Sequence, residues 1–156
     1  PVRHGYPPSA FATLPRLIER AGTSKIGSIT ALYTILLTAD LDEDPMVEEV
    51  KGLTDGHLIL SRAIAEQNRY PAIDINASLS RLQSNLLDKD ALQASGAIRA
   101  ALARIAKDRD LIALGAAPTP EFTSALAKEN AINSFLQQNT TECCEFEDTI
   151  EKLKLL

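Results

Sequence analysis

Residues 57–75 are HLILSRAIAEQNRYPAIDI, which contains two short apolar runs separated by a stretch of helical character. The runs at 57–60 and 72–75 predict buried strands, because each is short, apolar and bounded by polar or turn-forming residues. Residues 61–67 predict the helix that joins them. This segment therefore indicates alternating strand and helix, the pattern of an α/β fold.

The preceding residues extend the same pattern. Residues 27–37 (GSITALYTILL) are rich in β-branched side chains and apolar on both faces, which is typical of a strand covered by helices on each side. Residues 13–21 predict a helix with Thr13 as its N-cap, since Pro15 is tolerated only in a first turn. A second short helix is predicted at 46–50. The first half is thus an α/β unit.

The second half predicts only helices. Between residues 91 and 114, apolar side chains recur at helical spacing while the charged ones lie largely outside this stripe. Three shorter helices are predicted at 122–127, 131–138 and 145–156. We therefore expect an α/β domain at residues 1–81, followed by an all-helical domain at residues 82–156.

Composition excludes several classes of protein. The 156 residues carry a net charge of −5, so there is no basic surplus for binding nucleic acid. No apolar run approaches the roughly 20 residues that a membrane-spanning helix needs. The two cysteines, Cys143 and Cys144, are adjacent and cannot join distant segments, so we expect buried, reduced thiols. His4 and His57 are isolated, and no metal site is expected.

Three strands are few for a self-contained parallel sheet. We expect the first half to be the trailing edge of a larger sheet. The chain also starts at Pro1 without an initiator Met, which suggests a piece of a longer protein.

Five blocks in the first half carry a family resemblance: GYPPS (5–9), LPRLIERAG (14–22), GSIT (27–30), DGHLILSR (55–62) and RYPAIDINASLSR (69–81). The second half adds LIALG (111–115) and SFLQQ (134–138). Through these blocks the chain resembles the type III secretion ATPases, which include the flagellar export ATPase and its injectisome counterpart. The second half resembles their helical domain more loosely, and the catalytic subunits of rotary ATP synthases are similar at greater distance.

The resemblance implies the last part of a RecA-like nucleotide-binding core, with a mostly parallel sheet, and then a helical bundle. It implies six copies in a ring that hydrolyse ATP with Mg²⁺ to drive protein export. The family's G-x-x-x-x-G-K-[ST] phosphate loop is absent from these 156 residues. The chain thus resembles the last third of such an ATPase, and by itself we expect it to be inactive.

The resemblance also implies a setting. The partners would be other copies of the chain, a central stalk protein, export chaperones with their substrates, and the membrane-associated export apparatus. The protein would be cytoplasmic, at the inner face of the bacterial inner membrane. The acidic residues 40–44 would face the ring's pore; the alternative is a solvated turn.

Arg81 is the strongest candidate for chemistry. In the family, an arginine at the end of this block reaches the nucleotide of the neighbouring subunit. A planar guanidinium with five donors can stabilise charge on a transferred phosphoryl group. The alternative for Arg81 is a surface ion pair, which contributes little.

Three aromatic residues are candidates for nucleotide binding. An aromatic at the position of Tyr70 stacks on adenine in the rotary relatives. Tyr6 resembles a tyrosine near the phosphate end of that site, and Phe146 a second adenine-wall aromatic. The alternative for Tyr70 and Phe146 is packing in the core.

Two other functions stay open. The chain could act as a docking module for chaperones or the stalk, or belong to a non-catalytic rotary ATPase subunit.

On the helix predicted after residue 91, Arg99, Arg104 and Arg109 interleave with Asp108 and Asp110. This pattern predicts a solvated face.

Overall fold

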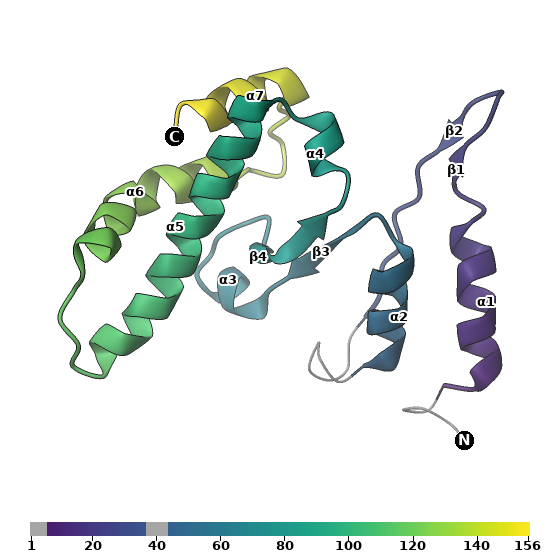
Figure 1. The fold of residues 1–156 in the computed structure, drawn as a ribbon, viewed down its shortest axis with the longest axis horizontal. Coiled ribbons are helices and arrows are strands. Elements are labelled where there is room, and N and C mark those ends of the chain that lie inside the picture. Colours follow the sequence, from purple (N-terminus) through teal and green to yellow (C-terminus); the bar gives the residue numbers. More distant parts are fainter. Residues whose placement is uncertain (1–5, 37–43) are drawn as a thin grey trace. The chain divides into compact units, whose positions relative to one another are not determined.

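The computed structural model describes residues 6–36 and 44–156. The chain is divided into two compact units, residues 1–57 and residues 58–156. Each unit is described by itself below, with the element labels of Figure 1. This division differs from the expected domain boundary after residue 81, which stays a prediction.

The first unit begins with helix α1, Pro8–Ile18. Its start at Pro8 shows that the predicted start at Thr13 is wrong. Pro8 occupies the first helical position, where a missing N–H costs nothing, and the helix continues through Pro15. Thr13 is no cap, because its Oγ1 donates to the Ser9 carbonyl within the helix at 2.8 Å.

Strands β1 (Gly22–Thr23) and β2 (Ser28–Ile29) follow as an antiparallel pair. The long buried strand predicted at 27–37 is wrong, since residues 30–36 contain no regular secondary structure and Leu32 is 91% exposed. An apolar strand needs strands beside it to satisfy its backbone and helices to cover its faces. Among the described residues, β1 is the only strand that pairs with β2, the part of this segment that is a strand.

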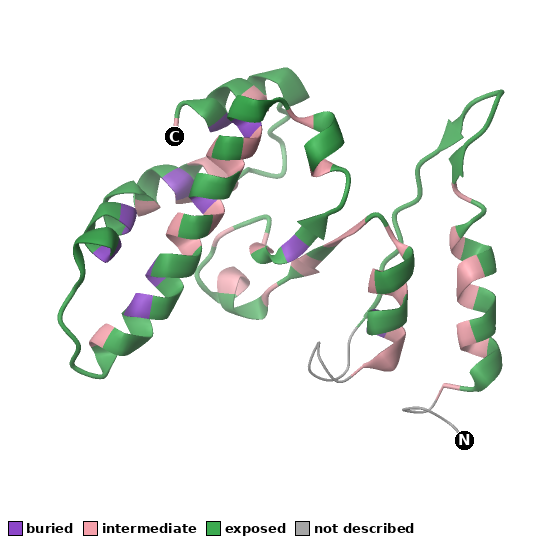
Figure 2. Cartoon of the chain, in the orientation of Figure 1, coloured by how far each residue is buried: buried purple, intermediate pink, exposed green. Residues whose placement is uncertain are grey.

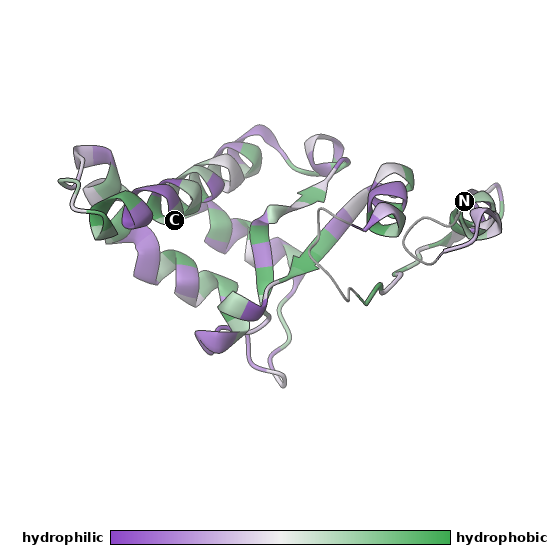
Figure 3. Cartoon of the chain, turned by 90° about the horizontal axis from the view of Figure 1, so that it is seen from below, coloured by the Kyte–Doolittle hydropathy of each residue, from purple (hydrophilic) through white to green (hydrophobic). Residues whose placement is uncertain are grey.

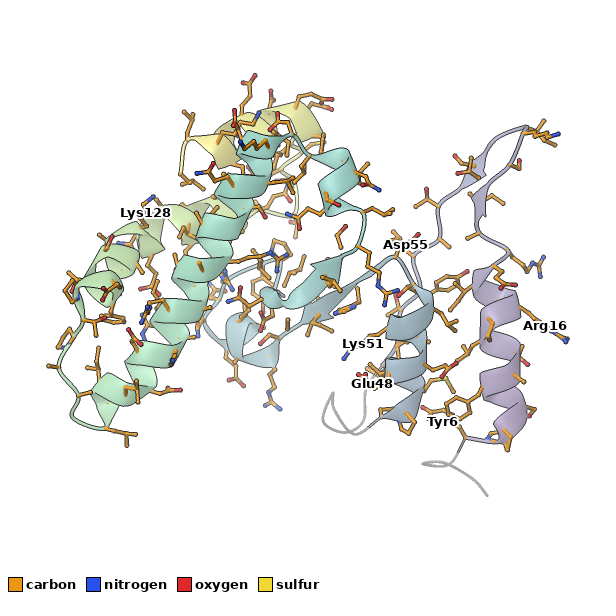
Figure 4. All side chains as sticks on the ribbon, viewed as in Figure 1. Tyr6, Arg16, Glu48, Lys51, Asp55 and Lys128 are labelled. Carbon is orange, nitrogen blue, oxygen red and sulfur yellow. The ribbon has the colours of Figure 1, made fainter. Side chains whose placement is uncertain are left out.

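Helix α2 (Pro45–Leu53) completes the first unit and packs against α1. Asp44 caps it by accepting a hydrogen bond from the Met46 amide at 2.8 Å. Lys51 and Glu48 form an ion pair at 2.8 Å on this helix, and both are labelled in Figure 4. The short helix predicted at 46–50 is therefore confirmed. Of the acidic segment 40–44, residues 40–43 lie outside the described residues.

The second unit contains strands where the pattern at 57–75 predicts them. The prediction that the strand at 57–60 is buried is wrong, since Leu58 is 69% exposed and Leu60 is 74% exposed. Strand β3 (Gly56–Leu60) is hydrogen-bonded to β4 (Ile73–Ser80), and helix α3 (Arg62–Glu66) joins them. The Ser61 amide donates to the Ala72 carbonyl at 2.8 Å, so the end of β3 lies beside the start of β4. This is the arrangement of an antiparallel pair. Among the described residues the expected mostly parallel sheet is replaced by two separate two-stranded sheets.

A helical bundle forms the rest of the second unit, as predicted. The helices are α4 (Gln83–Leu86), α5 (Lys89–Ala113), α6 (Pro120–Leu136) and α7 (Phe146–Lys154). Most buried residues lie on α5, α6 and α7 (Figure 2), and the helices carry hydrophilic and hydrophobic bands (Figure 3). The central cluster consists of Ala91, Ile98, Ile132 and Leu153.

Helix α6 merges the two helices predicted at 122–127 and 131–138. The intervening residues contain no glycine or proline, and the buried Phe122, Ala125 and Ile132 lie on one side of a continuous helix. No helix within residues 6–36 and 44–156 is long and apolar enough to cross a membrane.

The predicted solvated charges and buried thiols are partly wrong. Asp108 is buried, lies 3.6 Å from the Arg104 guanidinium, and accepts a hydrogen bond from Thr119 Oγ1 at 3.3 Å. This contact joins α5 to the start of α6, which periodicity alone does not reveal. Cys143 and Cys144 are exposed, because they lie in the connection between α6 and α7.

Ile132 is 1% exposed within the central cluster, so Ile132→Ala should lower the free energy of unfolding by about 2–5 kcal/mol. The matched control on the same helix is Leu126→Ala, because Leu126 is 41% exposed. We expect this variant to lose much less. Urea denaturation of the chain measures both, and equal losses would contradict the assignment of the core.

Candidate functional site

Arg81 directly follows the last residue of β4 and is exposed. A side chain at the end of a strand is carried by a rigid element yet projects into solvent. Arg81 also lies in the turn that leads into α4. This position places the Arg81 side chain at the exposed end of a strand.

Side-chain hydrogen bonds hold β4 in place just before Arg81. Arg99, on α5, donates through Nη1 to the carbonyl oxygens of Ile75 and Ser78. Ser78 Oγ donates to the Asp74 carbonyl at 2.5 Å and accepts from the Ile59 amide of β3 at 2.9 Å. The sequence did not predict these contacts of Arg99 and Ser78. Residue spacing does not show which strand carbonyl a helix arginine will bind.

Tyr70 lies in the connection between α3 and β4 and is 52% exposed. Its peptide bond to Pro71 is cis. The Tyr70 carbonyl accepts a hydrogen bond from the Gln138 amide at 2.9 Å, and Arg69 donates to Asn133 Oδ1 at 3.4 Å. The end of α6 therefore fixes the backbone of this connection while the ring stays accessible.

Phe146 is the first residue of α7 and is 60% exposed. The connection from α6 to α7 thus runs from Gln138, which bonds the Tyr70 backbone, to Phe146. With more than half of each residue exposed, neither Tyr70 nor Phe146 is a core residue of this chain. Both rings are available to stack on a flat ligand.

Tyr6 belongs to the first unit and is partly buried. Its ring meets Phe11 of α1 edge-on, with centroids 6.3 Å apart and an interplanar angle of 89°. Figure 4 shows Tyr6 close to the start of α1. The contact with Phe11 fixes this ring locally, as expected for an aromatic pair.

An ion pair links α7, whose first residue is Phe146, to the start of α5. Lys154 Nζ lies 2.6 Å from Asp88 Oδ2, and Asp88 also caps α5 by accepting from the Ala91 amide at 2.9 Å. The hydrogen bond from Lys154, with that from Ala91, lowers the pKa of Asp88 below its usual value. The same hydrogen bond raises the pKa of Lys154.

A metal site in a protein gathers ligating side chains close together. Residues 6–36 and 44–156 contain no group of three or more side chains that could ligate a metal. The 156 residues also lack a phosphate loop. The chain carries an exposed guanidinium at Arg81 and exposed aromatic side chains at Tyr70 and Phe146.

Two family models together match most of the chain. The model for the ATP synthase alpha/beta family, nucleotide-binding domain, matches residues 1–80. The model for the T3SS EscN ATPase C-terminal domain matches residues 87–155.

Curated relatives match along nearly the whole chain. It is 48% identical to a type 3 secretion system ATPase of Xanthomonas euvesicatoria, covering 98% of this chain and 35% of that protein. It is 42% identical to a flagellum-specific ATP synthase of Treponema pallidum, covering 100% and 36%. The chain therefore spans about a third of the length of the curated relatives it matches.

Solved structures have the same fold. The assembled ATPase EscN of the enteropathogenic E. coli type III secretion system matches with a TM-score of 0.89 and 41% identity, covering 97% of this chain and 38% of that one. The assembled EscN in complex with its central stalk EscO matches with a TM-score of 0.82 and 40% identity, covering 97% and 36%. These matches confirm the fold class: a trailing part of a RecA-like core followed by a helical bundle.

The Asp88–Lys154 pair should stabilise the chain at neutral pH and lose this effect in acid. The folded-state pKa of Asp88 lies below its usual value, so its contribution is present above about pH 3.8 and disappears as the pH falls through the folded pKa. We expect Asp88→Asn to have a lower Tm than the parent at pH 7. The difference in Tm should shrink as the pH falls below about 3.8. Thermal denaturation from pH 2 to 7 measures this. A gap that stays constant would show that the ionised pair contributes nothing.

Proposed function

The chain belongs to the ATP synthase alpha/beta family, in its type III secretion ATPase branch, and from this premise we propose that it forms the C-terminal portion of an ATPase that energises type III protein export. The observation that carries the proposal is the match along nearly the whole chain to relatives named as secretion ATPases and as a flagellum-specific ATP synthase. The matching blocks are shared by flagellar and injectisome members.

In this proposal Arg81 acts in trans as an arginine finger. Its exposed position at the end of β4 lets the guanidinium extend beyond its own subunit. There it would stabilise negative charge on the phosphoryl group of ATP bound by a neighbouring copy. Hydrolysis would then depend on assembly, and a related ATPase, EscN, has been solved as an assembled protein. We expect a hexamer.

The aromatic residues would contact the nucleotide. The Tyr70 ring, exposed on a backbone held by Gln138, would form one wall for adenine, and Phe146 a second. Tyr6 would lie near the phosphates. ATP and Mg²⁺ would be held mainly by a phosphate loop outside these residues, so the isolated chain should not hydrolyse ATP.

The partners follow from the same family membership. EscN has been solved in complex with its central stalk, which supports a stalk contact for this protein too. We further propose that export chaperones with their substrates, and the membrane-associated export apparatus, engage the full protein at the inner face of the bacterial inner membrane.

Docking of the stalk is the second candidate function. Co-purification of the chain with its stalk protein tests it, and failure to bind would remove it.

Arg81→Ala in the full-length protein should lower kcat for ATP hydrolysis by about 10³-fold or more, because an arginine finger contributes that much to phosphoryl transfer. Nucleotide affinity should stay within about threefold, as expected if the guanidinium acts on the transition state. Steady-state hydrolysis and titration with a fluorescent ATP analogue measure both. The control is Arg62→Ala, since Arg62 is an exposed arginine paired with Glu66 on α3. Unchanged turnover in the Arg81 variant would remove the assignment.

Tyr70→Ala should raise the KM for ATP about tenfold, because stacking of a base on an aromatic ring contributes about 1–3 kcal/mol. Tyr70→Phe keeps the ring and should leave KM nearly unchanged. The full-length enzyme is assayed over a range of ATP concentrations. Equal KM values for the alanine and phenylalanine variants would argue against an adenine wall at this position.

A further inference from the structure

Arg99, on α5, contacts the strand that ends at Arg81. Its Nη1 donates to the carbonyl oxygens of Ile75 and Ser78, the latter at 3.2 Å, and its side chain is partly buried. Building on the proposed function, we propose that Arg99 is a positioning residue. It sets the place at which β4 delivers the Arg81 guanidinium to the neighbouring subunit's site.

The contact with Ser78 lies close to Arg81 along the chain. Only three residue steps separate Ser78 from Arg81, so an extended strand spans about 10 Å between them. Ser78 is buried, and its hydroxyl also accepts a hydrogen bond from the Ile59 amide of β3 at 2.9 Å. The strand is thus bonded both to β3, through the Ser78 hydroxyl, and to α5, through Arg99. A shift of the backbone at Ser78 would therefore move Arg81 by a similar distance.

Arginine suits this role better than lysine. A planar guanidinium presents five donors in a fixed fork, so it can bind two carbonyl oxygens at once. A lysine ammonium is a compact point donor on a flexible stem. Carbonyl oxygens that β3 does not satisfy also need donors if they are to be shielded from water. Arg99 provides both the donors and a fixed direction.

The other arginines of α5 make different contacts. Arg104 lies beside the buried Asp108, and Arg109 pairs with Glu129 of α6 at 2.9 Å. Both bind carboxylates within the helical bundle. Arg99 instead links the bundle to the strand of the candidate site. Arg109 is therefore a matched control, with the same residue type on the same helix in an interhelix contact.

Arg99→Gln, Arg99→Lys and Arg109→Gln in the full-length protein test the proposal. Arg99→Gln should lower kcat by about 10- to 100-fold, since a displacement of about 1 Å costs that much. The KM should change by less than about twofold, and Arg99→Lys should recover part of the rate. Arg109→Gln should keep the parent's kcat. A purely structural role for Arg99 would instead lower Tm and assembly in Arg99→Gln below those of Arg109→Gln.

Mixed assemblies separate an effect through Arg81 from a local defect. Arg99→Gln subunits are combined with subunits whose own phosphate loop is disabled but whose Arg81 and Arg99 are intact. If Arg99 acts through Arg81, the second kind of subunit supplies a well-placed guanidinium to the first, and activity rises above that of either variant alone. No recovery would overturn the proposal. Should Arg99→Gln fail to assemble, Arg99→Lys carries the same mixing test.

The experiments also distinguish failure of the positioning role of Arg99 from failure of the proposed arginine finger, Arg81. Unchanged turnover in Arg81→Ala removes the arginine finger itself. If Arg81→Ala abolishes turnover while Arg99→Gln keeps kcat within about twofold, only the positioning role is overturned.

Discussion

The packing of α5 against α6 and α7 is the interaction on which the second unit depends. One face of α5 contributes Ala91 and Ile98 to the cluster that Ile132 and Leu153 complete. The same helix carries Asp88, which holds α7, and Arg99, which holds β4. A single long helix therefore connects the hydrophobic core to the strand that presents Arg81. Loss of its packing would disturb both.

The candidate site is assembled from backbone contacts between segments that are distant in sequence. Gln138, at the end of α6, bonds the Tyr70 carbonyl, and Arg99 bonds the carbonyls of β4. In both cases the helical bundle fixes the backbone, and the functional side chain projects from it into solvent. Backbone contacts with the helical bundle therefore support the segments that carry these exposed side chains.

Much of the fold could be predicted from the pattern of apolar residues. The strands near 57–60 and 72–75, the helix at 46–50 and the long helix α5 lie where the apolar pattern places them, although the strand at 57–60 is not buried. The strand at 27–37 was wrong because an apolar run specifies burial, not the neighbours that would provide it. The buried Asp108 and the exposed cysteines were wrong because the connections between helices decide which charged or thiol side chains meet another element.

Local order of residues was enough to identify the family blocks, the helical second half and Arg81, Tyr70, Phe146 and Tyr6 as candidates. The helical second half follows from the spacing of apolar residues, whereas the four candidate residues follow from the resemblance of these blocks to the type III secretion ATPases. The contacts of Arg99 with β4, of Ser78 with β3, and of Gln138 with Tyr70 came only from the three-dimensional structure. Each joins atoms through hydrogen bonds to the backbone, and every residue has the same backbone groups, so no side-chain pattern marks which carbonyl will be chosen.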